Sequence, residues 1–159
     1  MFRATTILLV TLTSAVIANA EEEALRMKQY EGQKFTLLIP ERAKVAKSTP
    51  AVDFDLYVVK YENKVLLRVY VGNAPHFPPR GFPSKADKDE RQEKAGVVVR
   101  SIRRQTTEYF SREVLMDMSK KVPEWPKFIH LWYQALPKKM AAVADTMIES
   151  ATVKDEIKQ

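Results

Sequence analysis

The clearest structural pattern in the sequence is Val52-Asp-Phe-Asp-Leu-Tyr-Val-Val-Lys-Tyr-Glu-Asn-Lys-Val-Leu-Leu-Arg-Val-Tyr-Val71. Apolar residues alternate in both of its halves, which is the two-residue period of a β-strand. Between the halves, Glu62, Asn63 and Lys64 form a short polar turn, and asparagine tolerates the left-handed conformation that tight turns need. The stretch therefore predicts a β-hairpin. The residues expected to share a face are Phe54, Leu56 and Val58 in the first strand, and Val65, Leu67, Val69 and Val71 in the second.

Further segments on either side of this hairpin also have the composition of strands. They are rich in β-branched and aromatic residues and are bounded by prolines or polar turns. Residues 103–110, RRQTTEYF, contain enough strand-forming residues to extend either neighbour. The predicted strands are residues 35–39, 43–48, 97–102, 112–118 and 128–133.

One helix is predicted near the C-terminus. Pro137 suits the first position of a helix, because the missing N–H has no partner there in any case. After it, apolar residues recur at intervals of three and four, which places them in one stripe. The chain is therefore expected to be an α+β domain, an antiparallel sheet of about five to seven strands with this amphipathic helix on one face. The stripe consists of Met140, Val143, Ala144, Met147, Ile148 and Ala151.

A second helix, which would make an α/β/α sandwich, has two candidate segments. Residues 21–33 are a charged leader, expected to be a short helix or disordered. Residues 84–96 carry a pattern like a capping box at Ser84 and Asp87, and Gly96 suits a helix end. This segment has no apolar face, so it is expected to be either a solvated helix or a mobile polar loop.

The first 20 residues are typical of a cleavable signal peptide. Arg3 precedes an apolar run that ends in Ala18-Asn19-Ala20, a small-residue cleavage pattern. The run is shorter than the roughly 20 residues that a membrane span requires. An uncleaved anchor or a core helix is the alternative. With cleavage after Ala20, we expect a periplasmic or secreted protein without a transmembrane segment, in which residues 34–153 form a single domain and residues 154–159 a polar tail.

Charge and cysteine content exclude several classes of function. Arg3 is the only charged residue of the signal segment, so its removal lowers the net charge from +6 to +5. This mildly basic balance is spread along the chain and does not resemble a nucleic-acid footprint. The chain has no cysteine. Thiol catalysis and zinc–thiolate sites are thus excluded, and the core alone must hold the fold.

Catalytic patterns are scarce. The sequence has neither a serine-nucleophile motif nor a glycine-rich phosphate loop. The only histidines, His76 and His130, lie in different elements, and no metal site or cofactor is predicted from them. His130 is expected to be a packed or surface imidazole in its strand, whereas His76 is expected to be exposed on a loop. Asp53 and Asp55 stand two apart on one strand, and a solvated face accounts for both.

Two features remain as candidate binding sites. The loop GNAPHFPPRGFP, residues 72–83, carries His76, Phe77, Arg80 and Phe82, and a second proline loop carries Trp125. Prolines reduce the entropy that such a loop loses on binding, so the aromatic residues suit the role of anchors. The densest basic group is Arg100, Arg103, Arg104 and Arg112. It is expected either to protect a sheet edge or to contact an anion or acidic protein, with Arg100 and Arg104 on one face and Arg103 on the other.

The order of elements resembles the PsbP/DcrB-like group of small exported domains. The residues that carry the resemblance are LLIP, FDLYVVKY, REVLMDM, FIHLWY and the helix MAAVADTMIES, within residues 34–152. The resemblance implies a helix–sheet–helix sandwich and a role in binding other proteins. No functional residue of that group is carried over, because the loop GNAPHFPPRGFP matches none of its motifs.

The leading hypothesis is therefore a non-enzymatic, exported interaction domain that binds another protein. Its partner would be a cell-envelope complex or a secreted protein, including a toxin if the chain is an immunity protein. The alternative is a small-ligand-binding protein or a hydrolase with a pocket containing His76 or His130. A third hypothesis is salt-sensitive association with anionic envelope polymers through the arginines.

Overall fold

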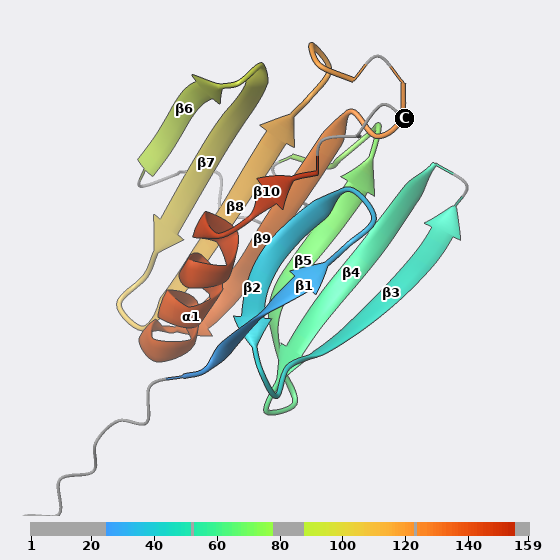
Figure 1. Cartoon of the computed structure of the whole chain (residues 1–159). Coiled ribbons are helices and arrows are strands. Elements are labelled where there is room, and N and C mark those ends of the chain that lie inside the picture. The colour runs from blue at the N-terminus through green and yellow to red at the C-terminus, as the bar shows by residue number, and fades with distance from the viewer. Residues whose placement is uncertain (1–24, 52, 78–87, 123, 155–159) are drawn as a thin grey trace, which may run out of the picture.

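The computed structural model describes residues 25–51, 53–77, 88–122 and 124–154. In these ranges the chain forms ten strands and one helix (Figure 1). The elements are β1 (Met27–Glu31), β2 (Phe35–Pro40), β3 (Lys44–Ala51), β4 (Phe54–Tyr61), β5 (Lys64–Gly72), β6 (Lys88–Lys94), β7 (Val97–Gln105), β8 (Tyr109–Asp117), β9 (Phe128–Pro137), α1 (Lys138–Glu149) and β10 (Thr152–Val153).

Two antiparallel sheets make up the fold. The large sheet has seven strands in the order β3-β4-β5-β9-β8-β7-β6, and the small sheet has three in the order β1-β2-β10. The predicted hairpin is β4–β5, and β9 inserts between it and the β6–β7–β8 meander. The large sheet therefore has its most buried strands, β5 and β9, at its centre.

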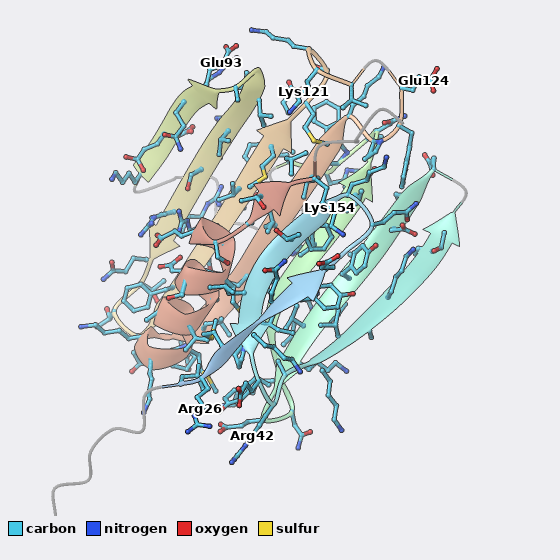
Figure 2. All side chains as sticks on the ribbon, in the orientation of Figure 1. Arg26, Arg42, Glu93, Lys121, Glu124 and Lys154 are labelled. Atoms are coloured by element: carbon cyan, nitrogen blue, oxygen red, sulfur yellow. The ribbon has the colours of Figure 1, made fainter. Side chains whose placement is uncertain are left out.

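Helix α1 and the small sheet lie side by side on one face of the large sheet (Figure 1). The core lies between these two layers: Phe35 of β2 meets Tyr57 of β4 edge to face, with ring centroids 5.0 Å apart. Residues of the helical stripe, among them Ala144 and Met147, are fully buried against β5, β8 and β9. Figure 2 shows Arg26 and Arg42 at one end of the strands, and Glu93, Lys121 and Glu124 at the other.

The predicted fold class is confirmed in its main features. The hairpin, the antiparallel sheet and the C-terminal helix on one face are all present. Asn63 adopts the left-handed conformation with φ 60°, and Glu62 before it does the same with φ 49°. Residues 103–105 extend β7, and residues 109–111 extend β8.

A second helix is not found among the described residues. From the predicted helical or loop segment 84–96, the described part from Lys88 to Lys94 is strand β6 at the edge of the large sheet. Side chains of this strand are charged or polar and mostly exposed. An edge strand with charged side chains on both faces has no apolar face. Its sequence therefore lacks the hydrophobic period that would distinguish it from a solvated helix.

The charged leader also differs from the expectation of helix or disorder. Its residues Met27–Glu31 form β1, which pairs with β2 across the small sheet. Met27 and Tyr30 are half-buried against the core. Two apolar residues among five are too few to show the hydrophobic period of a strand. Met27–Glu31 is a strand because it pairs with β2.

Two face assignments were wrong. Val65 does not share a face with Leu67, because the register shifts between Val59 and Lys60, so that Val65 pairs with Lys60 and Leu67 with Val59. Asp55 is buried on the core side of β4 and does not lie on a solvated face. Its carboxylate accepts a hydrogen bond from Thr49 Oγ1 at 2.6 Å and pairs with Lys47 Nζ at 3.0 Å. Two partners on the neighbouring strand β3 thus satisfy a charge that alternation alone assigned to solvent.

Candidate functional site

The face of the large sheet opposite α1 carries a pocket of about 410 Å³. Strands β4, β5 and β9 supply its sheet residues, because side chains two apart on each strand point to this face. Among the described residues, no helix or strand covers this part of the sheet. The lining consists of Asp53, Phe54, Leu56, Tyr70, Ala74, His76, His130 and Trp132.

Aromatic rings dominate the pocket. Phe54 and Tyr70 stack with ring centroids 5.2 Å apart, and the His130 and Trp132 rings stack at 4.8 Å. These four residues come from three adjacent strands, and Tyr70 is the register partner of His130. The two stacked pairs therefore lie next to each other on one sheet face.

Gly72 and Trp125 bring Asp53 to the rim. A Cβ on Gly72 would lie 2.8 Å from the backbone oxygen of Asp53 and 2.6 Å from the Tyr70 hydroxyl, so only glycine leaves room for both. The indole Nε1 of Trp125 donates to the same backbone oxygen at 2.8 Å. The Tyr70 hydroxyl accepts a hydrogen bond from the Ala74 amide at 2.9 Å. These contacts fix the loop against the end of the hairpin.

A buried charge cluster lies directly beside the pocket. Glu113 of β8 is 0% exposed, and its Oε1 accepts a hydrogen bond from Arg104 Nη1 at 2.6 Å. Its Oε2 lies 3.6 Å from His130 Nε2, which is longer than a hydrogen bond. Both of these atoms are buried without a hydrogen-bond partner among the described residues. Such atoms are rare in folded proteins, and each needs a specific explanation.

The His130 imidazole is neutral at pH 7. Burial lowers its pKa below the ordinary value of 6.5, and this effect outweighs the attraction of Glu113, which acts in the opposite direction. Since Arg104 already neutralises Glu113, the buried cluster carries no net charge. The pocket therefore has an uncharged imidazole in its lining.

Phe77 covers the other side of His130. Its ring meets the imidazole edge to face at 5.2 Å, and the Arg100 guanidinium lies 5.4 Å from the Phe77 ring centroid. Arg100 in turn forms two hydrogen bonds to Asp89 of β6, at 3.0 and 2.6 Å. The start of the loop GNAPHFPPRGFP is thus bound to the sheet by its aromatic residue.

The structure brings His76 and His130 to the same pocket, although they are 54 positions apart in the sequence. As predicted, His76 is exposed and His130 is packed. Trp125 is half-buried against the core rim and is not at the pocket itself. Arg80 and Phe82 lie outside the described residues.

The four arginines are divided between the two faces of the sheet, and the predicted separation of Arg100 and Arg104 from Arg103 is confirmed. The expectation that the group protects a sheet edge is wrong, because β7 and β8 are interior strands and β6 forms the edge. Arg100 and Arg104 lie on the pocket face, where they bind Asp89 and Glu113. Arg103 and Arg112 lie on the helix face, where they pair with two acidic residues of α1, Asp145 and Glu149. The helix-face distances are 3.8 Å and 3.5 Å for Arg103, and 2.9 Å and 3.1 Å for Arg112.

Sequence reasoning missed the parts of the site that depend on tertiary pairing. Phe54 and Leu56 were predicted only as a strand face, and Glu113 was not singled out. The available indication was the strand FIHLWY, whose alternation puts His130 and Trp132 on one face. No group of three or more His, Asp or Glu side chains suited to a metal is present in the described part of the chain.

Neither comparison with known proteins identifies a relative: no family model matches the chain, and no curated protein matches it in sequence. The site is therefore interpreted from its own geometry. Within the described ranges, no helix has the length and apolarity to cross a bilayer.

Proposed function

We propose that the protein is a non-enzymatic binding domain that holds a small ligand in the aromatic pocket on the open face of its large sheet. The observation that carries the proposal is the pocket itself: about 410 Å³, lined by four stacked rings from β4, β5 and β9. Ligand sites of folded proteins typically enclose about 300–1,000 Å³ and are mainly apolar with a few polar groups.

A small ligand is better supported than a protein partner. Phe77 packs against His130 and under the guanidinium of Arg100. The Trp125 indole donates a hydrogen bond to the backbone oxygen of Asp53. Hot spots of protein interfaces are instead side chains available to fill pockets on the partner. The binding of a protein through this loop is the second hypothesis.

Binding is also better supported than catalysis. The described lining of the pocket contains no serine, threonine or lysine that could act as a nucleophile. His130 directs its Nε2 toward Glu113 at 3.6 Å, a distance at which the carboxylate does not hold the ring by a hydrogen bond. Export to the periplasm or medium, inferred from residues 1–20, is part of the proposal.

Ligand-observed NMR with a library of small aromatic and aliphatic compounds tests the function. Ala74 is exposed at the pocket and lies outside the strands, so Ala74→Trp should fill the pocket without touching the core. Ala142→Trp places the same ring on the exposed side of α1, in the opposite layer. We expect compounds that bind the wild type and Ala142→Trp but not Ala74→Trp.

Thermal unfolding should show both variants folded before binding is compared. If no compound binds the wild type, or if binding persists in a folded Ala74→Trp, the proposed site is wrong.

A further inference from the structure

The carboxylate and the aromatic rings that line the pocket both favour a positively charged ligand. Asp53 is the only acidic side chain in the described lining, which contains no lysine or arginine. The remaining lining groups are apolar side chains, aromatic rings and the two imidazoles. The faces of aromatic rings are themselves electron-rich, so ring and carboxylate attract the same kind of ligand.

The Asp53 carboxylate is available to a ligand. Asp53 is exposed, and its side chain makes no hydrogen bond or ion pair with any described residue. Its position is fixed through its backbone, because Trp125 binds the oxygen and Gly72 permits the close approach. Burial raises the pKa of Tyr70, and the negative charge of Asp53 adds to the rise, so the carboxylate lies within electrostatic reach of the phenol.

Two of the arginines on the pocket face are paired with carboxylates. Arg104 neutralises Glu113 at 2.6 Å, and Arg100 neutralises Asp89 at 2.6 Å. Arg68 lies on the same face of the sheet, as the register partner of Trp132, but it is not part of the lining. Within the described lining itself, Asp53 is the only acidic side chain, and no lysine or arginine offsets it.

Resting on the proposed function, we infer that the ligand of this pocket is a small organic cation of the alkylammonium class. Its charged head would lie against the rings of Phe54, Tyr70 and Trp132, with Asp53 at the rim as its counter-charge. Rings grouped around a cation are the arrangement by which proteins recognise quaternary ammonium groups. An anionic ligand would meet Asp53 without a fixed cation in the described lining to bind it.

The net charge of the whole chain, +6, acts against this preference at long range. Salt screens such distant repulsion, with a Debye length of about 8 Å at physiological ionic strength, while contact with the rings and Asp53 is screened less. The affinity for the cation should therefore decrease with rising salt concentration. The decrease should be smaller than that expected for binding to a charged surface.

Isothermal titration with choline chloride and with its neutral isostere 3,3-dimethyl-1-butanol tests the inference. The two compounds have the same shape and differ in charge. We expect the wild type to bind choline about tenfold more tightly than the alcohol, as a desolvated cation–π contact with a nearby carboxylate supports. Asp53→Asn keeps the backbone oxygen that Trp125 uses, and it should remove this preference without changing the affinity for the alcohol.

Arg68→Gln is the matched control, because it removes one charge of opposite sign from the same face of the sheet. It should leave choline binding unchanged or tighten it. Equal or tighter binding of the alcohol by the wild type would overturn the cation inference and leave the small-ligand site standing. Preference for choline that persists in Asp53→Asn would also overturn it.

If neither compound binds, the inference is overturned, and the compound library with Ala74→Trp then decides separately whether the pocket binds any small ligand. Failure of the ligand class and failure of the proposed function are thus distinguishable.

Discussion

The carboxylate of Glu113 is fully buried in the large sheet, and Arg104 makes that burial tolerable. A carboxylate without a counter-charge would be strongly destabilising in this position, since desolvation is not offset by any other hydrogen bond to a described residue. The pair lies next to His130 and therefore links the stability of the sheet to the lining of the pocket.

Arg104→Ala should therefore reduce the free energy of unfolding by about 3–5 kcal/mol, because it leaves Glu113 buried and uncompensated. Arg100→Ala is the control on the same strand and the same face, and its exposed pair with Asp89 should be worth about 0–1 kcal/mol. Urea unfolding of the two variants measures the difference. If both variants lose a similar amount of unfolding free energy, burial of the Arg104–Glu113 pair does not determine its contribution to stability.

His130 should make stability fall on acidification. Its pKa is lowered by burial in the folded state, so the unfolded chain binds the proton first as the pH falls. The contribution of neutral His130 is present above about pH 6.5 and is lost between that value and the lower folded-state pKa.

An NMR titration of the two imidazoles follows this directly. We expect the His130 resonance to titrate below pH 6.5, and His130→Gln to flatten the decline of unfolding free energy below that pH. A His130 resonance that titrates above pH 6.5 would contradict the assignment.

Buried polar residues such as His130 and Asp55 show how far side-chain positions can be predicted from the sequence. Alternation placed His130 and Trp132 together correctly, since side-chain direction along a strand follows from the backbone. The same rule misplaced Asp55, whose burial depends on Lys47 and Thr49 of a strand that the local pattern does not report. Which charge is buried was decided by a partner on another strand.

Among the elements, helix α1 is joined to the large sheet by more than its apolar stripe. Asp145 receives hydrogen bonds from Arg112 at 2.9 Å and from the Tyr133 hydroxyl at 3.1 Å. Burial raises the pKa of Tyr133, and the negative charge of Asp145 raises it further, which keeps the phenol protonated as the donor. Glu149, one turn later, binds the same arginine but is 62% exposed.

Asp145→Ala should therefore cost about 2 kcal/mol of unfolding free energy, because Arg112 and Tyr133 are left with fewer partners in a half-buried place. Glu149→Ala, on the same helix and with the same arginine, should cost under about 1 kcal/mol. Chemical denaturation of both variants checks this. A larger loss for Glu149→Ala would refute this account of how the helix docks.

The turn between β6 and β7 gives a prediction of opposite sign. Ala95 has φ 51°, a left-handed conformation that costs a residue with a Cβ about 1 kcal/mol. Ala95→Gly should raise the melting temperature, whereas the same substitution in the exposed helix position, Ala142→Gly, should lower stability by about 1 kcal/mol. If both substitutions destabilise alike, the strain at Ala95 does not limit stability.

Elements with a strong period were predictable, and those without one were not. Strand β5 and helix α1 each bury an apolar face, and the alternating apolar residues of β4 lie on the open face, so all three patterns are visible in the sequence. Strands β1 and β6 lie at sheet edges and are largely polar, so only pairing with β2 and β7 defines them. The small sheet beside α1 was therefore not predicted, and the second helix of the expected α/β/α sandwich is not found among the described residues.

At the scale of the whole molecule, the two faces of the large sheet have different roles. One is covered by α1 and the small sheet (Figure 1) and forms the core. The other face carries the pocket, where Phe54, Tyr70 and Trp132 are half-exposed. Leaving aromatic side chains uncovered costs hydrophobic stabilisation, which a bound ligand would restore. The asymmetry of the two faces is the reason to place function on the open one.

Export of the chain is the remaining prediction at this scale. Expressed with its first 20 residues in a Gram-negative host, the protein should accumulate in the periplasm with Glu21 as its N-terminal residue, as residues 18–20 predict. Ala20→Arg should block processing, and N-terminal sequencing of the two products measures this. A full-length, cytoplasmic wild-type product would rule out the signal peptide.

The claim that the open-face pocket binds a small molecule can be tested by chemical-shift mapping of the isotope-labelled protein. During titration with the best compound from the library, resonances of Tyr70, Ala74, His130 and Trp132 should move together and saturate, while those of β1, β2 and β10 stay fixed. Saturable shifts confined to another surface, or none at all, would contradict the claim.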